Sequence, residues 1–358
     1  MDLKKGTLQD YFYSCEQDLN LFPDKRNYVS YYKNFKDFLD RDIHPEIKPV
    51  MSREDPHIYL NDHSEKHVAM VIEKATFLLI GMPEKDFLTP YEIFILLTAI
   101  QIHDAGHLIN ANRDTHAIDT SQIINELDKN AISAFERKII FDIARAHSGK
   151  EDIIGSQKEY IDISGETIRF RLIAAILRFA DELADGKVRA SNYLLKYDKL
   201  PIESKIFHTF SSCLDSFKIN IEGHEVNMTF CVNEEQVCTT YKKQKKDKTT
   251  GQIVLEDQLL IDEIYSRTLK TFNEALYYNR FIPAEMRINV INVEIIFLKK
   301  DTIDLNDIYF FDTIKYRIEE IGYPKMYSED IFEICNGFLL DSYGHKLNGE
   351  YIKQQIKN

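Results

Sequence analysis

A histidine and an aspartate, His103 and Asp104, stand at the end of a strongly apolar segment that runs from Ile93 to Ile102. The segment predicts a helix, and both side chains are costly to bury there without partners. A metal ion removes that cost, because imidazole nitrogen and carboxylate oxygen both ligate divalent metals. We therefore expect this helix to end at a metal site.

The histidines are concentrated around this pair. Seven of the eleven lie between His57 and His147, whereas even spacing over 358 residues would put about three in that window of 91 residues. Neutral imidazole is the commonest metal ligand in proteins. Upstream of the pair, His63 and His67 stand where another helix is expected to begin, and downstream Asp181 lies on a further apolar helix. These residues are the candidate partners of the pair.

Helical patterns dominate the first two hundred residues. Thr89, Pro90 and Glu92 have the spacing of an N-cap, a proline at the first helical position and a capping-box glutamate. A helix that begins near Glu65 is expected to stop at Gly81 and Pro83. The remaining helices are expected within 7–39, where one or two short ones fit, and over 117–128, 132–147 and 167–184.

The pattern changes after residue 200. Residues 217–221, 226–232 and 288–298 are expected to be strands, residues 259–278 a helix, and residues 303–356 mostly helical. We therefore predict a mainly α protein, in which a helical bundle precedes a smaller α+β segment and a helical C-terminal piece. The predicted domains are a helical N-terminal extension (1–50), a central domain (51–200) and an α+β domain (201–358) with a regulatory or specificity-setting role.

The order His67, His103-Asp104 and Asp181 resembles the H…HD…D signature of the HD superfamily of metal-dependent phosphohydrolases. The surrounding stretches "DHSEKHVAMVIEKA", "LLTAIQIHDAGH", "RAHSGK" and "AAILRFADELADGKVRA" are similar to HD domains with an elongated helical core. The resemblance covers residues 55–195. It implies that the central domain is an all-helical HD phosphohydrolase bundle with a metal at its centre.

The resemblance also implies roles for further residues. Two-metal members of the superfamily add histidines between the HD pair and the final aspartate, and we rank His147 first, His116 second and His107 third as such ligands. Asp104 would then bridge the two ions. The stretch "HDAGH" resembles that of deoxynucleoside-triphosphate hydrolases, where such a histidine assists catalysis. The predicted metal ligands are His67, His103, Asp104, Asp181, His147 and His116, and the predicted catalytic residues are Asp104, His107 and His63.

A phosphate ester bound at such a centre needs cations to balance its charge. The candidates by position are Lys66, Arg113, Arg145, Lys150 and Arg178. The mixed nitrogen and oxygen ligands suit a divalent transition metal, two per site, chosen from Mn, Fe, Co, Ni and Zn, and Mg is compatible.

The net charge and the absence of certain motifs exclude some classes of function for this protein. The formal net charge of −13 disfavours broad nucleic-acid binding, although a metal can admit a small anion. The lysine run between Lys242 and Lys248 is interpreted as a solvated loop tip between two strands, with a phosphate or nucleic-acid contact as the alternative. No P-loop, GxGxxG or GxSxG motif is present. We predict a phosphohydrolase acting on a nucleotide monoester or phosphodiester; the alternatives are a nuclease on single strands and a non-catalytic nucleotide-binding sensor.

The compartment is inferred from absent signals and from the cysteines. Residues Met1 to Gly6 lack an apolar signal region, and the apolar stretches are too short to span a bilayer. The five cysteines are scattered, without a CxxC pair, which suits a reducing compartment. We expect a soluble cytoplasmic protein with a small phosphate-containing substrate and no membrane partner.

Overall fold

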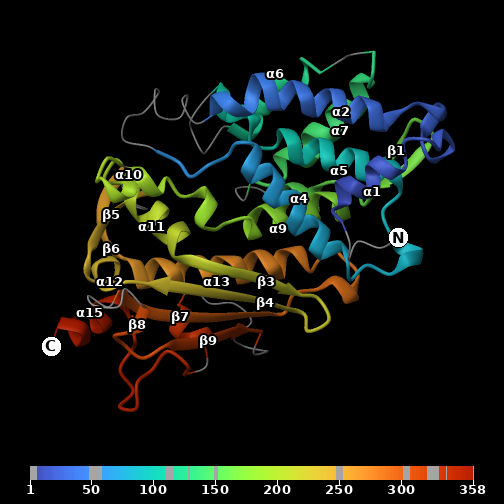
Figure 1. The fold of residues 1–358 in the computed structure, drawn as a ribbon. Helices are drawn as coiled ribbons and strands as arrows, with labels where there is room; N and C mark the ends of the chain where they lie inside the picture. The colour runs from blue at the N-terminus through green and yellow to red at the C-terminus, as the bar shows by residue number, and fades with distance from the viewer. Residues whose placement is uncertain are drawn as a thin grey trace. The chain divides into compact units, whose positions relative to one another are not determined.

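The computed structural model describes residues 6–47, 59–109, 116–127, 130–148, 152–246, 253–300, 307–320, 330–335 and 337–357. They belong to two compact units (Figure 1). The first unit comprises residues 1–55, 62–184 and 277–287, and the second comprises residues 56–61, 185–276 and 288–358. The structure is 54% helical and 18% strand, which confirms the predicted mainly α class.

The first unit is built mostly from helices. Its longer elements are α1 (Leu8–Ser14), α2 (Tyr28–Phe38), α4 (Glu65–Leu79), α5 (Pro90–Ile102), α6 (His116–Ile124), α7 (Ala134–Arg145), α8 (Ile153–Ser156), strands β1 (Tyr160–Ile163) and β2 (Glu166–Arg169), and α9 (Phe170–Leu183). Single turns connect them at Leu19–Leu21, Pro23–Lys25, Leu39–Ile43, Glu84–Asp86, Ala105–Leu108 and Ala284–Met286. The helices expected near 117–128, 132–147 and 167–184 are present with shifted ends, and the last begins only after strand β2.

Helix α5 is the centre of this unit. Its predicted capping box is present: the Thr89 side chain accepts from the backbone of Glu92, and the Glu92 side chain accepts from the backbone of Thr89. All residues from Tyr91 to Ile102 are buried, and α5 contacts α1, α2, α4, α6, α7 and α9. A helix that is apolar on every side is stable only when it is surrounded in this way. Its C-terminal end therefore delivers the next two residues, His103 and Asp104, into the interior.

The second unit combines a sheet with helices. Its elements are a single turn at Lys187–Arg189, α10 (Asn192–Lys196), α11 (Lys205–Cys213), β3 (Leu214–Asn220), β4 (Glu225–Val232), α12 (Glu234–Cys238), β5 (Thr240–Lys246), β6 (Ile253–Leu259), α13 (Leu260–Tyr278, to residue 276 in this unit), β7 (Val290–Lys300), β8 (Asp307–Tyr309), β9 (Ile314–Glu319), α14 (Ile331–Ile334) and α15 (Gly349–Lys357).

Strands β3, β4, β7, β8 and β9 form the sheet of the second unit, in which β7 pairs with β4, β8 and β9. The β4–β7 pair is parallel and the others are antiparallel. Helix α13 lies in the crossover that such a parallel pair requires. It packs against β9, where Thr268 Oγ1 lies 2.7 Å from the hydroxyl of Tyr316 and the ring of Tyr265 meets the Tyr316 ring edge-on.

Two predictions for this unit were wrong. The described part of residues 303–356 is not mostly helical, because β9 alternates buried and exposed side chains as an antiparallel partner of β7. The lysine run is not confined to a loop tip, because Lys242 to Lys246 lie on strand β5, which pairs with β6. Lys248 lies outside the described residues.

The chain passes from the first unit to the second between Ala184 and Asp185, among other points, and the domain boundary near residue 200 stays a prediction. Residues 277–287 belong to the first unit, which no sequence pattern indicated. Within the described residues, no helix combines the length and the apolar character that crossing a bilayer requires.

Candidate metal centre

Four of the predicted ligands meet at one point of the first unit. His67 lies in the first turn of α4, His103 and Asp104 follow the end of α5, and Asp181 lies in the last turn of α9. One ligand atom from each lies within 4.8 Å of the others. We call His67, His103, Asp104 and Asp181 the first group; its members come from three helices that are packed against one another.

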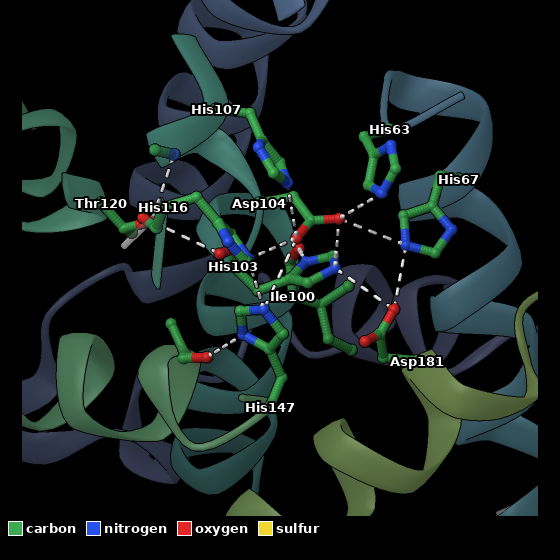
Figure 2. A network of polar contacts seen from close by, with 12 residues as sticks. His63, His67, Ile100, His103, Asp104, His107, His116, Thr120, His147 and Asp181 are labelled. Atoms are coloured by element: carbon green, nitrogen blue, oxygen red, sulfur yellow. Dashed lines mark hydrogen bonds and ion pairs between the residues drawn. The ribbon is translucent and has the colours of Figure 1, made fainter. Parts of the chain in front are cut away.

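The distances in the first group suit a shared cation (Figure 2). Asp104 Oδ2 lies 3.2 Å from His103 Nε2 and 3.5 Å from His67 Nε2. Asp181 Oδ1 lies 3.0 Å from His67 Nε2 and 3.6 Å from His103 Nε2. Metal bonds of about 2.1 Å place adjacent ligand atoms roughly 3.0 to 3.4 Å apart in octahedral or tetrahedral geometry. The four atoms could therefore hold one ion with little rearrangement.

A second group shares Asp104 with the first. It consists of Asp104, His116 and His147, whose ligand atoms again lie within 4.8 Å of one another. Asp104 Oδ1 is 3.5 Å from His116 Nε2 and 3.6 Å from His147 Nε2, and the two imidazole nitrogens are 3.0 Å apart. The two oxygens of Asp104 thus face different sets of histidines, as those of a carboxylate between two ions do.

Backbone carbonyls define the ring orientation of two histidines. His103 Nδ1 lies 2.7 Å from the carbonyl oxygen of Ile100, and His147 Nδ1 lies 2.6 Å from that of Ala144. A carbonyl only accepts, so each Nδ1 carries the hydrogen and, in the neutral ring, each Nε2 carries the lone pair.

These lone pairs converge with other electron-rich atoms. His103 Nε2 is buried and, among the described residues, makes no hydrogen bond, although oxygens of Asp104 and Asp181 lie within 3.6 Å. Lone pairs and carboxylate oxygens repel one another unless a proton or a cation lies between them. The donor set therefore fits a divalent metal, and buried His and Asp groups of this kind could hold one.

The charges of the centre are strongly coupled. Burial alone would raise the pKa of both carboxyls, but the surrounding histidines, His103 foremost, hold the pKa of Asp104 and of Asp181 well below the usual value. Burial alone would lower the pKa of His103, but Asp104 and Asp181 raise it above the usual value. Burial lowers the pKa of His147 to about 4, which keeps that ring neutral. The centre thus presents ionised carboxylates to any bound cation.

His63 and His107 lie just beyond the two groups. Their Nε2 atoms are 3.9 Å from Asp104 Oδ2 and 4.0 Å from Asp104 Oδ1, respectively. Figure 2 shows both above Asp104, with His147 and Asp181 below it. The rings of His63 and His107 are 5.1 Å apart, and the His107 ring stacks on that of His116 at 4.0 Å. The sequence prediction for these two residues was catalysis, and the structure brings both beside the metal groups.

Gly106 and Thr120 position His116, and sequence reasoning missed both. A Cβ at Gly106 would lie 1.9 Å from the carbonyl oxygen of His116, so only glycine allows α6 to approach so closely. Thr120 Oγ1 accepts from the backbone N–H of Gly106. Its own hydrogen can be donated to the carbonyl oxygen of His103 or of His116, which lie 3.3 Å and 3.2 Å away. The glycine three residues after His103 was the available sequence signal.

The predicted phosphate-binding cations lie in different surroundings. Lys66 is exposed, and Arg113 and Lys150 lie outside the described residues. Arg145, two residues before His147, is half-buried, and its buried Nε makes no hydrogen bond to a described residue. Arg178 is buried and donates to the carbonyl oxygen of Ser148.

Three lysines of strand β5 form ion pairs with acidic residues. Lys242 pairs with Asp257, Lys243 Nζ lies 2.5 Å from Glu263, and Lys245 Nζ lies 2.9 Å from Glu256. These ion pairs balance the charge of three of the five lysines in the run, and the side chains of the other two, Lys246 and Lys248, lie outside the described residues.

Comparison with known proteins identifies a family. The family model HD-CE matches residues 56–243, which is slightly more than half of the 358 residues and includes every residue of both metal groups. No curated protein and no solved structure matches the chain. The chain belongs to the HD-CE family.

Proposed function

We propose that this protein is a metal-dependent phosphohydrolase of the HD type that acts on a small nucleotide, either a monoester or a phosphodiester. The observation that carries the proposal is the position of Asp104, whose two oxygens face separate sets of histidines at 3.2 to 3.6 Å. Two-metal hydrolases of phosphate esters use ions about 3.5–4 Å apart, which a bridging carboxylate can hold.

The residues of the centre would have different roles in such a reaction. The first group would hold one divalent ion and the second group another. Such ions supply Lewis acidity toward a phosphoryl group and lower the pKa of water. His63 and His107, about 4 Å from Asp104, are placed to move a proton to or from the reacting oxygens. Arg145, two residues before His147 and with a buried Nε that makes no hydrogen bond to a described residue, is our candidate cation for the phosphate.

Charge supports a small substrate over a polymer. The net charge of −13 repels polyanions, and Lys242, Lys243 and Lys245 of strand β5 are paired with acidic residues. Both observations weigh against the nuclease alternative. The free cysteines, Cys15, Cys213, Cys231, Cys238 and Cys335, support a reducing compartment, and we propose the cytoplasm.

The test is metal analysis of purified protein followed by hydrolysis assays. We expect close to two divalent ions per chain and turnover of nucleotides or of a generic phosphodiester such as bis(p-nitrophenyl) phosphate. A chelator should abolish the turnover, and added Mn²⁺ should restore it. Single-stranded DNA and RNA belong in the same panel, because cleavage of strands without turnover of nucleotides would favour the nuclease. Metal and nucleotide binding without any turnover would favour the sensor.

A further inference from the structure

His147 reaches the centre from the turn that follows α7, two residues beyond the end of that helix. Its ring is oriented by the carbonyl oxygen of Ala144, which also accepts from the His147 backbone N–H at 3.3 Å, and the chain continues to Ser148, whose N–H donates to the Arg145 carbonyl at 3.2 Å. Arg178 contacts the residue after His147, because its Nη1 donates to the carbonyl oxygen of Ser148 at 3.3 Å. Arg178 lies one turn before Asp181 on α9, so the contact links the second group to the helix that carries a ligand of the first.

Tyr277 holds Arg178 in turn. The guanidinium carbon of Arg178 lies 4.3 Å from the centre of the Tyr277 ring, within the range of a cation–π contact. The Tyr277 hydroxyl donates to Asp152 Oδ1 at 2.5 Å, and Asp152 also accepts from the backbone of Gly155 as the cap of α8. Tyr277 therefore contacts Asp152 directly and is linked to Ser148 through the guanidinium of Arg178.

The hydroxyl is a donor at every ordinary pH. Burial, and the hydrogen bond to Asp152, raise the pKa of Tyr277 to about 12. Arg178 is 8% exposed, so its charge is costly to bury unless neighbours satisfy it, and the Tyr277 ring and the Ser148 carbonyl are two such neighbours. A change at Tyr277 should therefore disturb Arg178 and, through it, the turn after His147.

We propose that Arg178 and Tyr277 are positioning residues for the second metal position, the one formed by Asp104, His116 and His147. The inference rests on the proposed function, because it assumes that a second ion binds there. Tyr277 belongs to the segment 277–287 of the first unit and lies outside the region matched by the family model. Tyr277 acts on the second position through Arg178 and the Ser148 carbonyl, and it lies nearly a hundred positions after Asp181, the last ligand in the sequence.

The experiment is a Mn²⁺ titration of the full-length protein by calorimetry, with electron paramagnetic resonance to distinguish coupled Mn²⁺ pairs from single ions. Tyr277→Ala removes both contacts. Tyr277→Phe keeps the ring on Arg178 and removes only the hydroxyl, and Arg178→Lys keeps the charge without the planar group. Tyr193→Ala is the matched control, because this tyrosine is 78% exposed in the second unit.

We expect wild type and Tyr193→Ala to bind two ions as a coupled pair. Tyr277→Ala should weaken the second ion at least tenfold with the first ion within twofold of wild type, and the spectrum should become that of a single Mn²⁺. Tyr277→Phe should give a smaller loss, because Arg280 Nη2 still lies 3.6 Å from Asp152. Arg178→Lys should resemble Tyr277→Ala.

Two ions bound with unchanged affinities in all three variants would overturn the inference and leave the proposed function standing. An equal loss of both ions would also overturn it, since that result indicates a general structural role. If Tyr277→Ala does not fold, the same comparison is decided by Tyr277→Phe and Arg178→Lys. Wild-type protein that binds no Mn²⁺ would overturn the proposed function and the inference together.

Discussion

The two groups of the candidate centre share Asp104 but are supported differently. The first group takes His67, His103 and Asp181 from or next to α4, α5 and α9, long helices that are packed against one another. The second takes His116 from the first residue of α6 and His147 from the turn after α7. Rigid elements hold ligands more accurately than turns do. The first group is therefore organised by the core itself, and the second depends on Gly106, Thr120, Arg178 and Tyr277.

The largest effect is expected where the two groups meet. Asp104→Ala removes the carboxylate from both, so both ions should be lost and kcat/KM should fall by at least about 10³, in line with several kcal/mol of electrostatic stabilisation. Metal analysis and steady-state kinetics measure the two effects. Asp312→Ala, at an exposed aspartate, is the control. Unchanged metal content in Asp104→Ala would show that Asp104 does not hold the ions.

Substitution of one ligand at a time should affect the two ions separately. His147→Ala should leave the first ion bound and weaken the second by more than the roughly 10–100-fold that loss of an outer-shell partner typically costs. His103→Ala should weaken binding of the first ion by a similar factor, because His103 Nε2 faces the carboxylates of both Asp104 and Asp181. Calorimetry with Mn²⁺ gives both constants, with His345→Ala as the exposed control. Weakening of the same ion, or of both ions together, in the two variants would mean that the groups act as one site.

The two histidines beside the groups should affect turnover and leave binding intact. His63→Asn and His107→Asn should each keep both ions and lower kcat at least about 10²-fold, the usual contribution of a proton-transferring side chain. The measurement is kcat together with metal content in the same preparation. Loss of an ion in His107→Asn would instead make His107 a ligand, the third-ranked alternative from the sequence.

A change in the packing of α6 should weaken metal binding at the second group and leave metal binding at the first group unchanged. Gly106→Ala places a methyl group 1.9 Å from the carbonyl oxygen of His116, so α6 must move. We expect a loss of about 1–3 kcal/mol in the free energy of unfolding, typical of overpacking, and a weaker second ion. Urea denaturation and Mn²⁺ titration check the two parts. An unchanged second ion would show that His116 is not needed there.

The smallest effect is expected far from both groups. Lys242→Gln and Lys245→Gln each remove one partner of a solvent-exposed ion pair, worth at most about 1 kcal/mol of stability. Nucleotide turnover should stay within twofold of wild type. A large loss of binding to single-stranded DNA, measured by fluorescence anisotropy, would restore the nuclease alternative.

Much of the first group could be predicted because neighbouring residues in the sequence determine where its helices begin and which of them are buried. Capping residues such as Thr89 and Glu92 fix where α5 begins, and its apolar composition requires burial, so the position of His103 and Asp104 follows from the sequence. His67 and Asp181 were candidates from their places on predicted helices, and the resemblance to a family motif singled them out as ligands.

The other parts depend on distant contacts that have no local signal. Tyr277 and Arg178 are 99 positions apart, and nothing in either stretch indicates that they meet. Strand β9 was mistaken for helix because its short alternation of buried and exposed residues has meaning only beside β7. A strand is specified by its partner as much as by its own residues.

The central claim is that Asp104 lies between two divalent ions. The most direct measurement is a crystal structure of Mn²⁺-loaded protein with anomalous scattering collected near the manganese edge. The account predicts two anomalous peaks about 3.5–4 Å apart, one among His67, His103 and Asp181 and the other between His116 and His147, with an oxygen of Asp104 on each. Crystals from the same Mn²⁺-saturated solution with no anomalous peak at Asp104 would contradict it.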